Sequence, residues 1–325
     1  MRDRCADKRT RNVAPAVFCA LWLAIGATFP AGAAAQPDPD LQTEEVEITL
    51  PGVTGEYSIL WVSDMHICCF PEDGEVLPEH SEQAGERAEL LRNADGVPSA
   101  RRWEQISAGI DAFGADYVVF GADMIDYASE ANLDALSAGL AGVNTPWMYI
   151  RADHDYGRWY VDMGIRKMRS LHREIAPQEK MWVQRFDGFT LVGLDNTTSA
   201  VTQETLDAFR EICAEGVPVL LCTHVPFDQP EEADRSAPDS LAALSRECWG
   251  DRVLCWGKED YYDTEKSSVM EQMADLIYEE DSPVRAVFAG HLHASWEGSL
   301  TPACMEHVFS AAFEDHIGLI TVRGE

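Results

Sequence analysis

The chain has 325 residues, of which 46% are hydrophobic and 25% are charged, and its formal net charge at pH 7 is −31. A surface with this much negative charge repels polyanions at long range. We therefore expect no nucleic-acid partner. A phosphate-bearing ligand would have to be attracted locally, by bound cations.

The first 35 residues have the pattern of a secretory signal peptide. Five basic residues precede position 12, an apolar stretch runs from Val13 to Phe29, and residues 33–35 are alanines that offer a cleavage site. The apolar stretch is short for a transmembrane helix, although an uncleaved N-terminal anchor is the alternative. We therefore predict a signal peptide at residues 1–35 and a mature domain at 36–325. This domain would be secreted or extracytoplasmic, without a membrane span, and would carry −34, because residues 1–35 account for +3.

Short apolar runs recur along the mature domain. Their length and their aromatic and β-branched residues favour buried strands. We predict strands at residues 57–63, 117–121, 147–150, 189–194, 217–223, 284–290 and 317–322. Amphipathic helical patterns lie around residues 103–113, 133–140, 206–212 and 270–277. Residues 68–100 and 229–263 read as irregular segments, and the alternation of the remainder predicts a layered α/β domain.

Polar residues that suit metal binding follow five of the predicted strands. In chain order they are Asp64 and His66, Asp123 and Asp126, Asp153 and His154, His224, and His291 and His293. A strand-end cap or a packed histidine would explain any one of these motifs. All five in order are harder to explain in that way, because the ends of parallel strands gather at one edge of a sheet. Mixed aspartate and histidine ligands suit Mn, Fe or Zn better than Ca or Mg.

This ordered set resembles the calcineurin-like metallophosphoesterase family, from about Tyr57 to the C-terminus. The resemblance implies a four-layer α/β/β/α sandwich, with two central mixed sheets flanked by helices, and two divalent metal ions. Asp64, His66 and His293 would hold the first ion. Asp123 would bridge both ions, and Asp153, His224 and His291 would hold the second. His154 would protonate or stabilise the leaving oxygen, and Asp126 would orient its imidazole by accepting a hydrogen bond.

The resemblance also implies an activity. A hydroxide between the two ions would attack the phosphorus of a small phosphodiester or phosphomonoester, and no protein nucleophile is needed. Two alternatives remain open: a catalytically silent metal-binding protein of the same fold, and a two-metal hydrolase of non-phosphate esters. Asp126 also has an alternative, as the cap of the following helix. The oligomeric state cannot be read from the sequence.

Two positions depart from the family pattern. Ala122 stands where the family has glycine. Its methyl group would be strained if the backbone φ at this position is positive. Asp153 stands where the family has asparagine, so the site loses an amide donor and gains a negative charge. We expect this charge to favour singly charged phosphodiesters. Asp155 is expected to cap a helix or to pair with an arginine, and Trp159 either packs in the core or borders the substrate.

Overall fold

The computed structural model describes residues 38, 40–178, 180–197, 201–229, 234, 236–250, 254–255 and 268–325. The predicted signal peptide at residues 1–35 lies outside these ranges. Residues Ala35–Glu325 form one compact unit. None of the helices described in it is long and apolar enough to cross a membrane.

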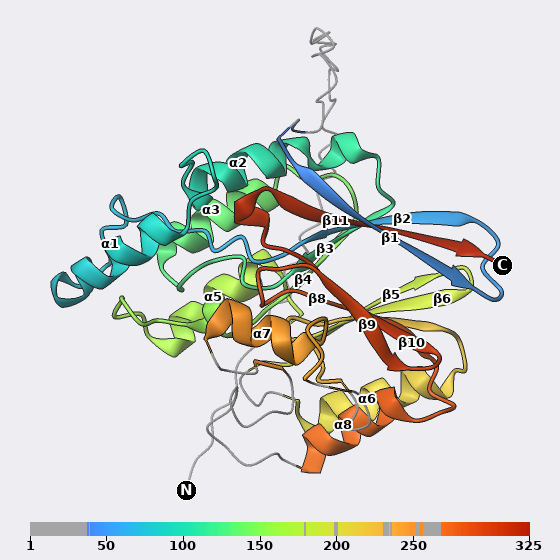
Figure 1. The fold of residues 1–325 in the computed structure, drawn as a ribbon. Helices are drawn as coiled ribbons and strands as arrows, with labels where there is room; N and C mark the ends of the chain where they lie inside the picture. Colours follow the sequence, from blue (N-terminus) through green and yellow to red (C-terminus); the bar gives the residue numbers. More distant parts are fainter. Residues whose placement is uncertain are drawn as a thin grey trace, which may run out of the picture. The chain divides into compact units, whose positions relative to one another are not determined.

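The described strands form two mixed sheets that pack face to face (Figure 1). The first sheet has five strands in the order β1 (Gln42–Leu50), β11 (His316–Gly324), β2 (Glu56–Val62), β3 (Tyr117–Gly121) and β4 (Trp147–Ile150). The second has six, in the order β5 (Met181–Phe186), β6 (Phe189–Leu194), β7 (Val219–Cys222), β8 (Val284–Ala289), β10 (Cys304–Val308) and β9 (Trp296–Thr301). Strands β2, β3 and β4 are parallel, as are β6, β7 and β8, so their carboxyl ends collect at one edge of each sheet.

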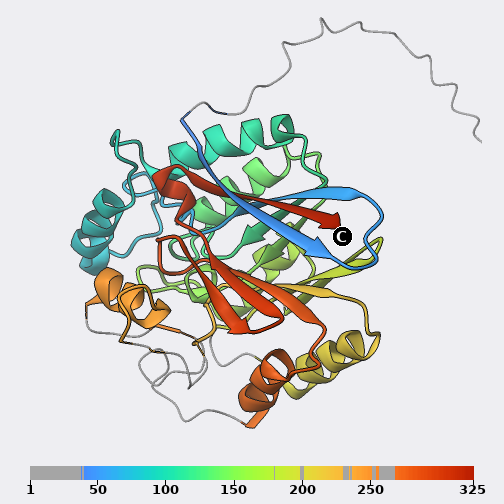
Figure 2. The ribbon, with the colours of Figure 1, turned by 45° about the vertical axis from the view of Figure 1, so that its right-hand side comes forward.

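Helices cover the outer face of each sheet. The five-stranded sheet packs against α1 (Ser81–Leu90), α2 (Ser99–Gly109), α3 (Glu130–Leu140) and α5 (Ile165–Ile175). The six-stranded sheet packs against α6 (Gln203–Ala214) and α8 (Ser268–Tyr278). Figure 2 shows α6 and α8, in gold and orange, on the far side of the sheets from α2 and α3. The short helix α4 (Asp153–Tyr156) follows β4, α7 (Leu241–Trp249) packs beside β9, and three 3₁₀ turns span Pro78–His80, Ile110–Phe113 and Ala312–Glu314.

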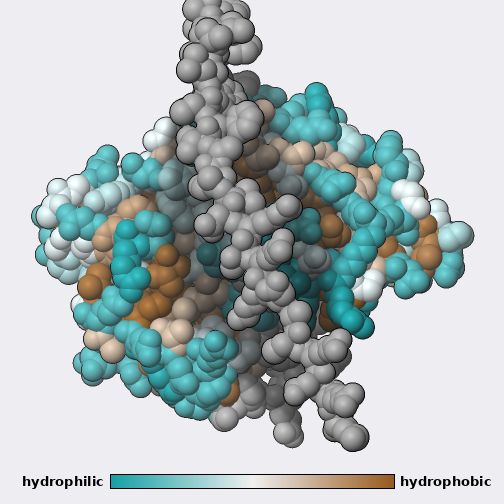
Figure 3. All heavy atoms as spheres, turned by 180° about the vertical axis from the view of Figure 1, so that it is seen from behind, coloured by the Kyte–Doolittle hydropathy of each residue, from teal (hydrophilic) through white to brown (hydrophobic). Residues whose placement is uncertain are grey.

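The layers follow from alternation along each central strand. In β2, Ile59 and Trp61 point into the core between the sheets, while Leu60 and Val62 point to the helices. All four side chains are fully buried, and burial of such side chains stabilises the fold by about 1.5–3 kcal/mol each. Outside, hydrophilic residues predominate on the face shown in Figure 3, with smaller apolar patches between them.

The predicted four-layer sandwich is therefore confirmed, as are the seven predicted strands to within a few residues. The prediction missed β1, β5, β9 and β10. It was also wrong in treating two segments as irregular throughout. Residues 68–100 contain α1 and the start of α2, and α7 lies within residues 229–263, part of which is outside the described ranges.

Candidate metal centre

The loops that follow β2, β3, β7 and β8 are joined directly by hydrogen bonds. The N–H of Asp64 donates to the carbonyl of Ala122 (3.0 Å), and the N–H of His66 donates to the carbonyl of Asp123 (2.9 Å). From the other sheet, the N–H of His291 donates to Asp64 Oδ1 (3.0 Å). These bonds fix the ends of both sheets against each other, so the predicted site residues converge.

Six of the seven predicted ligands form two groups of three. In the first, His293 Nε2 lies 3.1 Å from His66 Nε2 and 3.6 Å from Asp64 Oδ1. In the second, His224 Nε2 lies 3.0 Å from Asp123 Oδ2 and 3.3 Å from His291 Nδ1. Each group therefore draws ligand atoms from both sheets.

Asp123 connects the two groups. Its Oδ2 lies 3.0 Å from His224 Nε2 and 3.8 Å from His66 Nε2, so one carboxylate faces both sets of imidazoles. Asp153 belongs to neither group. Its Oδ1 is nevertheless buried without a hydrogen-bond partner among the described residues. Burial, and then the carboxylate of Asp123, raise the pKa of Asp153, so Asp153 lies near enough to Asp123 to interact with its charge.

The donor set fits two divalent transition-metal ions. Two ligand atoms bound about 2.1 Å from one ion lie about 3.0–3.4 Å apart, close to most of the separations within each group. Burial lowers the pKa of His66 to about 4 and that of His291 to about 3, so both imidazoles are neutral near pH 7, as metal ligands must be. Burial would also lower the pKa of His224, but the carboxylates of Asp123 and Asp64 outweigh it and raise that pKa to about 10, so an ion bound there would have to displace a proton. The buried Oδ1 of Asp123 also has no partner among the described residues. Facing imidazole nitrogens and unpartnered carboxylate oxygens are costly without a cation.

The backbone at the ligands is strained. Asp64, His66, Asp123, His291 and His293 all have positive φ angles, between 43° and 74°. L-residues rarely adopt this conformation, which costs on the order of 1–3 kcal/mol each and persists where the surroundings enforce it. These strained positions carry five of the six residues of the two ligand groups.

Two small residues shape the same loops. The backbone φ of Ala122 is 77°, so its methyl group is strained, as expected for a positive φ. At Gly290, a Cβ atom would lie 2.1 Å from Asp64 Oδ2, so only glycine allows this close approach of the β2 and β8 loops.

The carboxylate of Asp126 lies between the imidazoles of His66 and His154. Its Oδ1 lies 3.3 Å from both His66 Nδ1 and His154 Nδ1. The nearest acceptor for His154 Nδ1 is the backbone carbonyl of Asp126, at 2.8 Å. The alternative reading of Asp126 as a helix cap is wrong, because Ser129 caps α3. Desolvation would lower the pKa of His154, but Asp123 and Asp126 outweigh it and raise that pKa to about 9.

Arg87 is a site residue that the sequence did not reveal. It lies on α1, and its Nε and Nη2 each approach Asp126 Oδ1 to 2.9 Å. The guanidinium thereby fixes the carboxylate that faces both His66 and His154. No motif marks Arg87, because the contact depends on how α1 packs over the site.

The expected helix cap at Asp155 is confirmed, because its carboxylate accepts a hydrogen bond from the N–H of Ala152, the residue that precedes α4. The sequence did not reveal its further contacts. Its fully buried carboxylate accepts hydrogen bonds from Tyr149 Oη (2.7 Å) and from four backbone N–H groups. Those groups belong to Ala152, Asp123, Met124 and Ile125, at 2.9–3.3 Å. The expected pairing with an arginine is wrong, since Arg151 and Arg158 donate to backbone carbonyls instead. Asp155 therefore holds the strained loop that carries Asp123.

Comparison with known proteins identifies the family. The sequence profile of the calcineurin-like phosphoesterases matches residues 57–295. The chain belongs to this family. It is thus a metal-dependent hydrolase of phosphate esters.

Solved structures show only distant likenesses, and no curated protein sequence matched the phosphoesterase. A dimetal phosphatase from Danio rerio is 14% identical, with a TM-score of 0.45 over 79% of this chain and 88% of that chain. A purple acid phosphatase from yellow lupin is 12% identical (TM-score 0.45; 79% and 44% covered), and a putative 5′-nucleotidase from Staphylococcus aureus is 10% identical (TM-score 0.42; 82% and 51% covered). This chain spans about half the length of the latter two. The family assignment therefore rests on the sequence match.

Two partly exposed indoles border the centre of this phosphoesterase. Trp159, which is 48% exposed, has its ring 4.8 Å from that of His154. Trp249, at the end of α7 and 37% exposed, lies 5.5 Å from the His293 ring and 6.4 Å from the His291 ring. The exposure of Trp159 contradicts the reading as a core residue, and its role at the border of the substrate stays a prediction.

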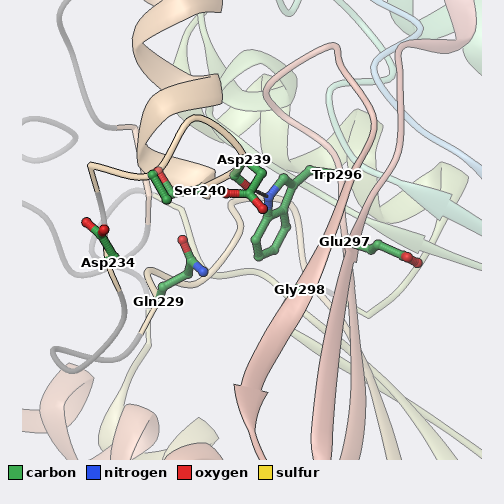
Figure 4. Close-up of a pocket in the computed structure, with 8 residues that line it drawn as sticks. Gln229, Asp234, Asp239, Ser240, Trp296, Glu297 and Gly298 are labelled. Atoms are coloured by element: carbon green, nitrogen blue, oxygen red, sulfur yellow. Dashed lines mark hydrogen bonds between the residues drawn. The ribbon is translucent and has the colours of Figure 1, made fainter.

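A separate pocket of about 260 Å³ lies between the start of α7 and β9 (Figure 4). It contains none of the predicted site residues. Asp234, Asp239 and Glu297 are its charged lining residues, beside the indole of Trp296. Because all charged residues of the lining are acidic, the pocket does not suit a phosphate ester, and it is not the candidate active site.

Proposed function

We propose that this phosphoesterase hydrolyses a small phosphodiester or phosphomonoester at a dinuclear metal centre. The proposed ligands are Asp64, His66, Asp123, Asp153, His224, His291 and His293. The observation that supports this most directly is the position of Asp123, whose one carboxylate oxygen faces both groups of imidazoles. Such an arrangement suits two neighbouring ions that share a bridging ligand.

The protein's own side chains would then orient the substrate and move the proton. Two bound divalent ions would supply Lewis-acid activation of water and neutralise charge on the phosphoryl group. His154 directs Nδ1 to Asp126, which leaves Nε2 to donate a proton to the leaving oxygen. Asp126 and Arg87 hold that imidazole in place.

We further propose a preference for phosphodiesters over phosphomonoesters. A diester has a single negative charge and two organic groups. The extra negative charge of Asp153 disfavours a dianionic monoester, and the indoles of Trp159 and Trp249 offer two apolar surfaces to organic groups.

The test combines elemental analysis with parallel assays. We expect about two ions of Mn, Fe or Zn per chain, and turnover of bis-p-nitrophenyl phosphate above that of p-nitrophenyl phosphate and p-nitrophenyl acetate. Asp123→Ala should lose metal and activity, whereas His316→Ala, a histidine paired with Glu44, should keep both. Full activity of Asp123→Ala, or hydrolysis of the acetate alone, would refute the proposal.

We also propose that the protein is exported, on the evidence of the basic and apolar segments in residues 1–35. Cell fractionation with N-terminal sequencing provides the test. We expect the mature protein outside the cytoplasm with Gln36 at its N-terminus. An intact Met1 on a cytoplasmic protein would contradict the proposal.

A further inference from the structure

The outer surface of α5 is basic in a strongly acidic chain. Four of the chain's 25 lysines and arginines lie in residues 166–173. Arg166, Arg169 and Arg173 are spaced by three and four positions, so they lie along one side of the helix. All three are exposed, and the row extends for about 10 Å at the helical rise. We call these three residues the arginine row.

Two of the three arginines of this row, Arg166 and Arg169, have no acidic partner among the described residues. Lys167, on another side of α5, pairs with Glu130. Within the described ranges, no acidic side chain forms an ion pair with Arg166 or Arg169. Their charges are therefore available to an anionic partner.

The row faces away from the metal centre. The opposite side of α5 carries the buried residues Met168 and His172, and His172 Nε2 lies 2.6 Å from the backbone oxygen of Asp155 in α4. Since this buried side packs toward α4, the arginines on the outer side do not reach a small substrate bound at the centre. They suit an extended anionic surface outside the protein.

Exposed apolar residues lie at the N-terminal end of the same helix. Ile165, its first residue, is 49% exposed, and Trp159 lies in the connection from α4 to α5. Arginines on a helix that begins at an exposed aliphatic side chain, with an exposed indole earlier in the same connection, are a combination that suits the interface of a lipid bilayer.

We propose that α5 and its arginine row dock the protein on an anionic lipid surface. The docking is separate from hydrolysis, because no residue of the row belongs to the proposed centre. It also explains how so acidic a protein approaches such a surface, since the row presents a local positive face.

Vesicle sedimentation tests the proposal, using residues 36–325, which contain both sheets and all the described cores. We expect binding to vesicles of phosphatidylglycerol and phosphatidylcholine at low salt, weaker binding at high salt, and little binding to phosphatidylcholine alone. Each cation near an anionic membrane contributes roughly fivefold in affinity, so Arg166→Gln/Arg169→Gln should bind about 30-fold more weakly.

Two controls make the result decisive. Arg185→Gln/Arg323→Gln removes the same charge from exposed arginines on β5 and β11, and should bind like the parent. Arg166→Lys/Arg169→Lys keeps the charge and should also bind. Thermal unfolding and turnover of a soluble substrate should be unchanged in all three variants.

The proposal is overturned if the parent binds neutral and anionic vesicles equally, or if the glutamine variant of α5 binds as well as the parent. An equal loss in the β5 and β11 control would overturn it too, as would binding to single-stranded DNA without binding to vesicles. Because sedimentation requires no turnover, failure of docking and failure of the proposed hydrolysis are distinguishable.

Discussion

Asp155→Asn tests whether one buried carboxylate holds the loop of the bridging ligand. Asparagine keeps the shape of the side chain and one acceptor oxygen, but it replaces the other oxygen with an amide donor. In one orientation the amide faces the N–H groups of Ala152 and Asp123, which donate to Asp155 Oδ2 at 2.9 and 3.0 Å. In the other, it faces the three donors that now serve Oδ1. Every orientation therefore opposes donor to donor.

The magnitude follows from the number of lost partners. The orientation with the smaller penalty leaves two buried N–H groups unpaired. Each unpaired group costs about 1–3 kcal/mol, so we expect the free energy of unfolding to fall by about 2–6 kcal/mol. The φ of Asp123, 47°, is enforced by these hydrogen bonds. Metal affinity should therefore fall as well, by about 10–100-fold.

Denaturant unfolding and metal titration of the same variant provide the assay. Asp111→Asn is the matched control, because the Asp111 carboxylate also accepts several hydrogen bonds, from Asn144 and Thr145, but is not part of the metal centre. It should lose stability and keep its metal affinity. The reasoning fails if Asp155→Asn changes neither property, or if both variants lose metal affinity equally.

Three other substitutions and one pH dependence carry separate expectations. Arg87→Ala should lower turnover about 10–100-fold, while Arg92→Ala, at an arginine paired with Glu89 away from the centre, should not; equal steady-state rates would contradict the role of α1. His154→Gln should slow an alkyl ester about 100-fold and a p-nitrophenyl ester less, since nitrophenolate needs no proton; equal losses would argue against proton donation. Asp153→Asn should weaken metal binding and raise the ratio of monoester to diester turnover; an unchanged ratio would refute the charge argument. Burial raises the pKa of Asp111, but hydrogen bonds outweigh it and lower that pKa to about 2, below about 3.9 in the unfolded chain. Its stabilisation is thus present above about pH 4 and lost toward pH 2, so unfolding of the parent and Asp111→Asn should converge over that range; a constant difference would contradict it.

The candidate ligands were predictable because each follows a buried strand. An apolar run such as residues 118–121 predicts a buried strand, and the polar residue that follows it indicates where the strand ends. Arg87 and Asp155 were not predictable in this way. Their contacts reach Asp126 and Asp123 from other elements, and such contacts depend on tertiary packing that no local pattern encodes.

The missed strands had different causes. In β1, Val46, Ile48 and Leu50 alternate with exposed acidic or polar residues, which is a strand pattern that the strong local charge obscured. Strand β9 contains Gly298 and two hydroxyl residues and lies at the edge of its sheet, so its sequence has little of the apolar signal of a central strand. Helix α1 has few buried residues, and only its packing over the site shows its importance.

Each candidate group takes its ligands from both sheets. Bound metal would therefore affect the stability of the fold as well as catalysis. An ion held by Asp64 and His66 on one side and His293 on the other would act as a cross-link between the N-terminal and C-terminal halves of the chain. Binding at a free concentration 100 times the dissociation constant would add about 2.7 kcal/mol to the stability of the folded state. Removal of the metal by a chelator should therefore weaken the packing between the two sheets. The stability of the folded protein would then depend on the free metal concentration around it.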